Sequence, residues 1–493
     1  MNGTHRDLSN PHKTGILHFG LGAFHRAHQA DFTQDAMDAV GGDWGIEAVS
    51  MRDAKLANAV NHHNDFSLLV KRPEGDAYKR VTAIKKAYSL ADNPTIIAQR
   101  IAAANIHIIT ITVTEKGYGL DRITSGLDTK DPIVQHDLAN PSSPKGLLGI
   151  LVAGLDLRKQ TLGTGLTLIS CDNLPSNGKL LKRLVLEFAR VSNGELANWI
   201  VDKCTFPCSM VDRITPASTD VTLNLARQNL GRDDPLAVET EPFRQWVIED
   251  DFAGPRPAWD RVGVTFVKNV EPFELMKLRM LNGAHSFIAY LGTFLEFTAV
   301  RDVMANSSFS SLIDQHMKLA GETLPEIHGF NLDAYRAALV ERFKNTAIDH
   351  RCIQIAMDGS QKLPQRIFAA AKIRLDAGKN ISSFALTTAL WMKHIEGKTV
   401  FGAPLPLNDP MAETLKTAII QCTGSAADQT HALGKIDGLE TYGLFTKPEW
   451  LASVISAKKL LDRLETQQAN SGEATIEFHI SEIQWWFMGP IKA

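Results

Sequence analysis

The sequence predicts an α/β protein in which a parallel β-sheet with helices is followed by a mainly α-helical second part. Short apolar runs rich in β-branched residues recur in the first half and indicate interior strands. After about residue 268 such runs largely vanish, and long amphipathic stretches replace them. The 493 residues also exceed what one hydrophobic core usually organises. We therefore predict two domains, 1–268 and 269–493.

The first strand is expected at 14–20 (TGILHFG), directly before a helix-compatible segment. A second strand follows at 45–51 (GIEAVSM), and another helical stretch begins near Ala54, so the chain opens as β-α-β. Two further apolar runs, 106–114 and 164–170, are expected to be strands of the same parallel sheet. In the second half, 274–291 and 334–344 are the clearest amphipathic helices.

Composition favours a small-molecule partner. The formal net charge of -3 gives no long-range attraction toward nucleic acid or an anionic membrane. Five cysteines in no secretory context argue against a disulfide framework, and the pair Cys204 and Cys208 lacks the further ligands that structural zinc requires. The polar N-terminus resembles no secretory signal, and no window has the ~20 apolar residues that span a bilayer. We expect a cytoplasmic protein without a bound metal.

A glycine motif follows the first predicted strand. Gly20 and Gly22 stand where a dinucleotide-binding turn has its first two glycines, although His25 occupies the place of the usual third. Such glycines let the backbone approach a pyrophosphate, whose charge the following helix N-terminus can meet. Phe24, His25 and Arg26 complete the candidate cofactor segment, with the His and Arg as possible donors. The alternative is an ordinary turn between strand and helix.

Asp53 stands just past the second predicted strand. An acidic residue there would accept hydrogen bonds from the adenosine ribose hydroxyls and repel a 2′-phosphate, which favours NAD over NADP. Arg52 beside it would instead suit the extra phosphate. A loop aspartate that only serves solubility is the remaining alternative.

The stretch 271–286 (EPFELMKLRMLNGAHS) combines a helix start with polar groups on one side. On an ideal helix Lys277, Asn282 and His285 fall within a sector of about 140°. A desolvated lysine becomes a usable base near neutral pH, Asn282 can donate to a developing alkoxide, and His285 can bind a neighbouring hydroxyl. A polar helix face that only meets water is the competing interpretation.

Polar residues also follow two of the predicted strands. Asp172 and Asn173 come after 164–170, and Glu115 comes after 106–114. Active groups of open parallel sheets cluster at such carboxyl ends, so Asn173 is a second candidate alkoxide donor and Glu115 a candidate proton carrier. Turn formation and a solvated loop charge are the alternatives.

Taken together, several motifs resemble the polyol-specific long-chain dehydrogenases, the mannitol dehydrogenase family. The resemblance implies a Rossmann-type N-terminal domain, a helical C-terminal domain, an active site between them, no zinc and a monomer. Order and spacing agree from about residue 15 to 400 in HFGLGAFHRAHQA, TVTEKGY, SCDNLPSNG, MVDRITP, EPFRQWVIED, MKLRMLNGAHSF and MDGSQKLPQR.

The resemblance also implies roles for single residues. Lys277 matches the family's general base, and Asn173 and Asn282 match its pair of oxyanion donors. Substrate-contacting positions correspond to His285, Asp212 and Lys362. Acidic residues that conduct or gate the proton leaving the lysine correspond to Glu115 and Glu274.

Within the family, TEKGY, MKLRMLNG, QIAMDGSQKLPQR and EPFRQWVIED resemble the fructuronate reductases, or D-mannonate oxidoreductases. Mannitol 2-dehydrogenases tend to have Gly at Lys116, a non-basic residue at Arg279 and Arg at Gln354. The resemblance thus implies NAD-dependent interconversion of D-mannonate and D-fructuronate. Mannitol, arabinitol or tagaturonate as substrate, or a nucleotide-binding protein without catalysis, are the alternatives.

A sugar-acid carboxylate needs donors that a neutral polyol does not. Arg279 and Lys116 are the candidates, with Arg366 as a further one. Arg279 lies two residues from Lys277 and would point about 160° away from it on a straight helix. A structural ion pair is therefore the alternative role for Arg279.

Overall fold

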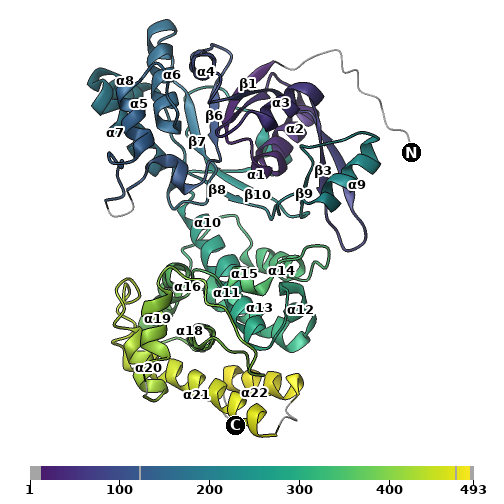
Figure 1. Cartoon of the computed structure of the whole chain (residues 1–493), viewed down its shortest axis with the longest axis vertical. Helices are drawn as coiled ribbons and strands as arrows, with labels where there is room; N and C mark the ends of the chain where they lie inside the picture. The colour runs from purple at the N-terminus through teal and green to yellow at the C-terminus, as the bar shows by residue number, and fades with distance from the viewer. Residues whose placement is uncertain (1–12, 122–123, 423, 472–474, 489–493) are drawn as a thin grey trace. The chain divides into compact units, whose positions relative to one another are not determined.

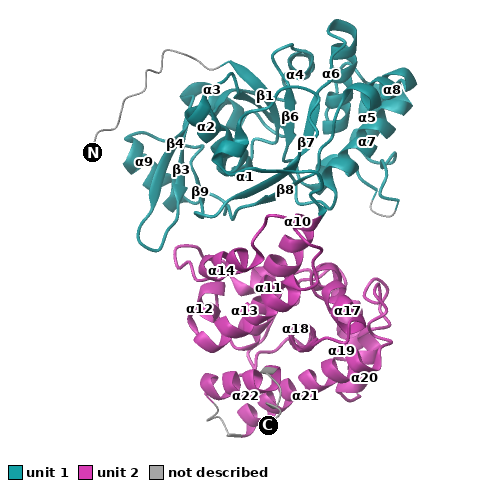
Figure 2. Ribbon diagram, turned by 180° about the vertical axis from the view of Figure 1, so that it is seen from behind, with its two compact units in different colours: residues 1–271 teal, residues 272–493 magenta. Residues whose placement is uncertain are grey.

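The computed structural model describes residues 13–121, 124–422, 424–471 and 475–488. The chain divides into two compact units, Met1–Glu271 (unit 1) and Pro272–Ala493 (unit 2), which Figure 2 colours separately. Unit 1 contains all the named strands of the described residues, and unit 2 is built from helices, as expected from the sequence. Among the described residues, no helix combines the length and the apolar character needed to cross a membrane.

A five-stranded parallel sheet forms the centre of unit 1 (Figure 1). The strand order reverses between β1 and β6, and in such sheets the crevice outside the carboxyl ends at this point is the usual ligand site. In sheet order the strands are β5 (Ile84–Ser89), β2 (Gly45–Ser50), β1 (Thr14–Phe19), β6 (Ile108–Ile111) and β7 (Thr167–Ser170).

Both faces of this sheet are buried, because successive side chains of each strand point in opposite directions. Leu17 and Phe19 belong to one hydrophobic cluster, whereas Ile16 belongs to the other. The first cluster includes residues of α4 (Pro94–Ile101), α6 (Leu147–Thr161), α7 (Asn177–Ser192) and α8 (Gly194–Lys203). The second includes residues of α1 (Ala23–Ala27), α2 (Gln29–Val40) and α3 (Lys55–His63).

Two small sheets and the edge strand β5 are absent from the sequence-based assignment. Their strands are three to six residues long, too short to give a clear period. One sheet contains β8 (Ser209–Asp212), β10 (Gln245–Glu249) and β11 (Thr265–Val267), and the other contains β3 (Phe66–Val70), β4 (Ala77–Val81) and β9 (Val238–Thr240). The remaining helices of unit 1 are η1 (Glu115–Tyr118), α5 (Pro132–Ala139), α9 (Asp220–Leu230) and η2 (Trp259–Val262).

Two helices form the core of unit 2. Every residue of α11 (Gly283–Phe294) is buried, and α18 (Ser382–Glu396) is buried over almost its whole length. A helix that is apolar all round must be surrounded by others, and α18 packs against both α11 and α21 (Pro448–Ser471).

The remaining segments of unit 2 are helical too. In chain order they are α10 (Glu271–Met276), η3 (Lys277–Asn282), α12 (Val300–Ala305), α13 (Ser307–Gly321), α14 (Leu332–Phe343), α15 (Cys352–Ile355), α16 (Gly359–Leu363), η4 (Pro364–Phe368), α17 (Ala369–Asp376), α19 (Ala412–Ile419), α20 (Ala426–Leu433) and α22 (Ile476–Met488).

Candidate active site

The two glycines after β1 have different structural requirements. Gly20 has φ +104°, and a Cβ built on it would lie 1.9 Å from the Thr112 carbonyl oxygen. Only glycine fits there. Gly22 is exposed, and a Cβ on it would meet only the Gly20 carbonyl oxygen at 3.9 Å. No neighbouring atom of the protein requires a glycine at position 22. A glycine there is consistent with a backbone that is kept open so that a ligand can approach it.

His25 and Arg26 lie beneath this turn. His25 has 0% exposure, its ring stacks on His18 at 3.4 Å, and burial holds its pKa well below the usual value. Arg26 is 5% exposed and donates through Nη1 to the Leu21 carbonyl oxygen at 3.1 Å. The expectation that these two side chains donate to a cofactor is corrected, because both are packed inside the unit. Phe24 is half-buried and stacks on His28 at 5.0 Å.

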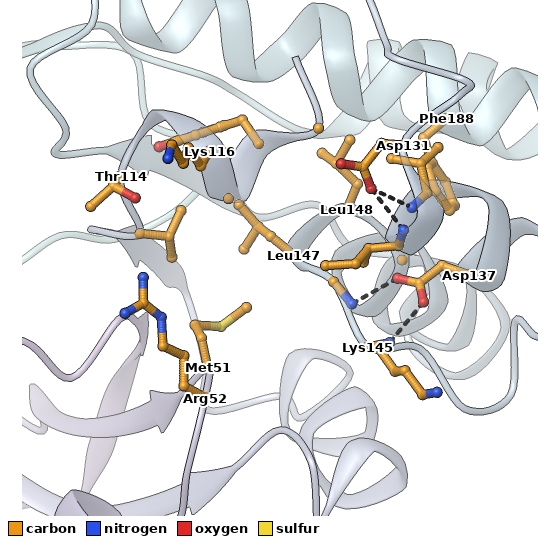
Figure 3. Close-up of a pocket in the computed structure, with 18 residues that line it drawn as sticks. Met51, Arg52, Thr114, Lys116, Asp131, Asp137, Lys145, Leu147, Leu148 and Phe188 are labelled. Atoms are coloured by element: carbon orange, nitrogen blue, oxygen red, sulfur yellow. Dashed lines mark hydrogen bonds between the residues drawn. The ribbon is translucent and has the colours of Figure 1, made fainter. Parts of the chain in front are cut away.

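A pocket of about 240 Å³ opens beside the carboxyl ends of β2 and β6 (Figure 3). Met51 and Arg52 line it from the β2 side, and Lys116 lines it from η1. Leu147 and Leu148, at the start of α6, give the pocket an apolar part. The lining therefore combines apolar side chains with charged ones of both signs, because Asp131 and Asp137 also belong to it.

Asp53 is exposed just past β2, and its Oδ1 accepts the Lys55 N–H at 2.9 Å where α3 begins. Its carboxylate is fixed by the turn, and its neighbour Arg52 is exposed too and lines the pocket.

The loop after β6 is strained and held by one carboxylate. Thr114 has φ 69° and ψ 158°, a region that glycine almost alone adopts and that costs about 1–3 kcal/mol. The Asp172 carboxylate, at the end of β7, accepts the N–H groups of Val113 at 3.0 Å and Thr114 at 3.2 Å. It also accepts the Tyr118 hydroxyl at 2.8 Å. Asp172, which the sequence leaves as a turn former, therefore fixes the backbone that carries Glu115 and Lys116.

The end of β7 is fixed in turn by the side chain of Asn177. Its amide donates to the carbonyl oxygens of Ser170, Asp172 and Ser209 at 3.0, 3.1 and 2.8 Å. Asn173 projects from this loop and is exposed. Glu115 is half-buried on η1, and Asp212, the last residue of β8, is 5% exposed.

Lys277 and Asn282 are the two ends of a π-helix, η3, inserted between α10 and α11. The Gly283 N–H donates to the Leu278 carbonyl oxygen, five residues earlier. In such a segment residues five apart lie above one another, so Lys277 and Asn282 share a face more closely than the ideal helix predicts. The regular helix expected over 274–291 is thus corrected, and π-segments occur often at functional sites. Glu274 lies half-buried on the preceding α10.

His285 follows on α11 and is 7% exposed. Burial, followed by the charges of His350, Arg342, Arg366 and Lys277, holds its pKa well below the usual value, so the ring is neutral. The rings of Phe343 and His350 pack on it at 4.7 and 4.9 Å. Its Nε2 is buried and has no hydrogen-bond partner, a costly arrangement that a substrate hydroxyl would relieve.

Arg279 does not belong to this face. Its Nη1 donates to the carbonyl oxygen of Thr323 at 2.7 Å and to the hydroxyl of the same residue at 3.2 Å, and the side chain is 8% exposed. The expectation that Arg279 contacts a substrate carboxylate is corrected, because its guanidinium anchors η3 to the end of α13. The guanidinium of Arg279 therefore serves a structural contact.

Lys362 and Arg366 come from α16 and a second π-helix, η4. Lys362 Nζ donates to the Met357 carbonyl oxygen at 2.6 Å and lies 3.7 Å from an Asp358 carboxylate oxygen. Burial, followed by the nearby charge of Arg366, lowers the pKa of Lys362. Gly359 begins α16 against Trp391 and Tyr290, where a Cβ would lie within 2.6 Å of both.

Sequence reasoning did not find Arg342 and His350, which act electrostatically on His285. Both lie more than 50 positions away in the chain, at the end of α14 and in the loop after it, so no local spacing relates them to His285.

Two family models match the chain. Residues 14–261 match the mannitol dehydrogenase Rossmann domain, and residues 269–446 match the mannitol dehydrogenase C-terminal domain. A D-mannonate oxidoreductase of Escherichia coli is 39% identical over 452 residues, which are 90% of this chain and 93% of that protein. A mannitol 2-dehydrogenase of Aspergillus oryzae is 36% identical over 414 residues, 82% of each chain.

Among solved structures, the Pseudomonas fluorescens mannitol 2-dehydrogenase in a ternary complex with NAD and D-mannitol is 31% identical, with a TM-score of 0.75. The match covers 93% of this chain and 95% of that one.

Proposed function

This chain belongs to the mannitol dehydrogenase family, and we propose that it is a metal-independent oxidoreductase that uses NAD to interconvert D-mannonate and D-fructuronate. The observation that carries the proposal is the face of η3 and α11, where Lys277 and Asn282 share one side of a π-helix beside the unpartnered Nε2 of His285. A base, an alkoxide donor and a hydroxyl-binding group are what oxidation of a secondary alcohol requires.

The residues around β1 and β2 fit a dinucleotide. Gly20 makes the turn, Gly22 leaves its backbone open, and Asp53 stands where it would accept hydrogen bonds from the adenosine ribose. The apolar part of the pocket beside Met51 suits an adenine ring. Bound NAD would supply the acceptor for the hydride that leaves the substrate carbon.

In the oxidative direction, Lys277 in its neutral form takes the proton of the reacting hydroxyl. Asn282 and Asn173 donate to the oxygen as its negative charge develops, and His285 holds a neighbouring hydroxyl. Glu115 and Glu274 carry the proton onward from Lys277. In the reductive direction the protonated lysine is the acid that completes the new hydroxyl.

The choice of D-mannonate is supported by the 39% identical D-mannonate oxidoreductase and by two arginines that act electrostatically on His285, Arg342 and Arg366. D-mannitol is the second candidate, because the named mannitol 2-dehydrogenases are nearly as similar. A positively charged site favours the acid over the neutral polyol. We also expect the enzyme to act as a monomer.

A substrate panel tests the proposal. D-mannonate, D-mannitol, D-arabinitol, D-fructuronate and D-tagaturonate are offered with NAD and with NADP, or with the reduced cofactors for the two ketoacids. We expect the highest kcat/KM with the mannonate–fructuronate pair and NAD. A clear preference for D-mannitol would overturn the substrate assignment. NADH binding without turnover of any panel member would instead favour a non-catalytic protein.

A further inference from the structure

Arg366 lies on η4, which packs against η3 in the same unit. A Cβ on Gly283 would lie 3.2 Å from the Arg366 carbonyl oxygen, so the two π-segments approach closely. The Arg366 Nη1 donates to the Ser286 hydroxyl at 3.3 Å, next to His285. Arg366 and Lys277 both act electrostatically on His285, so both cationic side chains lie near its ring.

The guanidinium of Arg366 forms no salt bridge within the described residues, and Asp358, which acts on it electrostatically, also lies 3.7 Å from Lys362 Nζ. The side chain is half-buried, and burial lowers its pKa to about 10. A guanidinium carries five N–H donors, and the long bond to Ser286 uses one of them. Taking such a cation partly out of water with only one long hydrogen bond is unfavourable, unless a ligand supplies further acceptors.

Other arginines show how this protein normally satisfies a buried guanidinium. Each fully buried arginine of the described residues donates to a backbone carbonyl or a carboxylate; these are Arg26, Arg158, Arg213, Arg279 and Arg374. Arg366 has only a hydroxyl, at the long end of the hydrogen-bond range. It is therefore set apart from the arginines that serve packing.

The charges around Arg366 indicate that its ligand is an anion. Lys362 already faces the Asp358 carboxylate and two carbonyl oxygens, so its charge is largely compensated. Arg342 adds a further positive charge that acts on His285. A planar carboxylate matches the fork of a guanidinium through two parallel hydrogen bonds, and a neutral polyol offers no such group.

We infer that Arg366 binds the carboxylate of a sugar-acid substrate through its guanidinium fork, while His285 contacts a substrate hydroxyl, and that Arg366 thereby selects sugar acids over neutral polyols. The inference rests on the proposed function, since it assumes turnover at Lys277. The residue that selects the substrate carboxylate is then Arg366 on η4 and not Arg279, whose guanidinium is hydrogen-bonded to Thr323.

The experiment compares wild type, Arg366→Ala and Arg366→Lys with D-mannonate and D-mannitol at saturating NAD. For Arg366→Ala we expect kcat/KM for D-mannonate to fall roughly 10- to 100-fold, mainly through KM, as for loss of a charged hydrogen bond. The value for D-mannitol should change less than about threefold. Arg366→Lys should lie between, and guanidinium ion should partly restore the alanine variant with D-mannonate. Arg463→Ala, a surface arginine paired with Glu482, is the matched control.

Equal losses with both substrates, or no loss with either, would overturn the role of Arg366 while leaving the proposed function intact. A wild-type enzyme that oxidises D-mannitol but not D-mannonate would overturn both. If thermal unfolding shows that the alanine variant does not fold, Arg366→Lys provides the test instead. Its ratio of kcat/KM for D-mannonate to kcat/KM for D-mannitol should still fall, because lysine keeps the charge but lacks the two parallel donors of the guanidinium.

Discussion

The candidate functional residues of unit 1 and those of unit 2 are held in different ways. In unit 1 the residues around Gly20 and Asp172 are fixed by backbone conformation and by hydrogen bonds between loops at the carboxyl ends of strands. In unit 2 Lys277, Asn282 and Arg366 lie on two π-segments inside continuous helices. The first arrangement fixes where backbone atoms lie, and the second fixes how side chains converge.

This difference predicts that substitutions in the two units will affect protein stability and turnover differently. A change in the unit 1 loops disturbs hydrogen bonds that the fold itself uses, so it should alter unfolding and cofactor binding together. A change on the η3 face alters a side chain assigned to the chemistry, so it should alter turnover more than unfolding.

The largest expected effect tests the unit 2 side of this comparison. Lys277→Ala should lower kcat by about 10²- to 10⁴-fold, because general base catalysis contributes that much. NADH affinity, measured by fluorescence titration, and the unfolding temperature should stay close to wild type. Lys416→Ala, an exposed lysine of the same unit, is the control. Retained turnover would show that another group is the base.

The glycine pair tests the unit 1 side. Gly20→Ala should lower the free energy of unfolding by about 3 kcal/mol, through strain at φ +104° and overlap with Thr112. Gly22→Ala should leave unfolding within about 1 kcal/mol of wild type. It should weaken NADH binding about tenfold, because its added methyl group faces the ligand. Chemical denaturation and NADH titration of both variants measure this. An unaltered NADH affinity in Gly22→Ala would show that the pyrophosphate does not bind at this turn.

Much of the fold was predictable because its signals are local. The apolar runs at β1, β2, β6 and β7 gave the parallel sheet, and the amphipathic stretches gave the helical unit. Lys277 and Gly20 were predicted as site residues because motif and resemblance agree on them. The π-helices have no distinct sequence period, and the partners of Arg279 and His285 come from distant segments. Helical spacing already pointed Arg279 away from Lys277, whereas the burial of His25 and Arg26 depends on long-range packing that spacing does not show.

The smallest expected effect concerns Asp172, whose carboxylate holds the strained backbone of Thr114 and thereby positions the loop after β6. Asp172→Asn replaces one of the two accepting oxygens with an amide N–H₂, so the side chain can no longer accept both from Thr114 at one oxygen and from Val113 and Tyr118 at the other. We expect about 2 kcal/mol less unfolding free energy, the usual cost of losing a hydrogen bond to a charged group. NADH binding should also weaken, because the loop that carries Lys116 into the pocket is no longer fixed.

Thr114→Gly sharpens this test, because glycine adopts the φ of 69° without strain. If Asp172 holds Thr114 in its strained conformation, the glycine substitution should stabilise the otherwise wild-type protein more than it stabilises Asp172→Asn, in which Thr114 can relax. A double-mutant cycle measured by chemical denaturation then gives a coupling free energy of about 1 kcal/mol or more. Strictly additive effects would mean that the strain at Thr114 is maintained by the rest of the loop, and that Asp172 acts only through Tyr118.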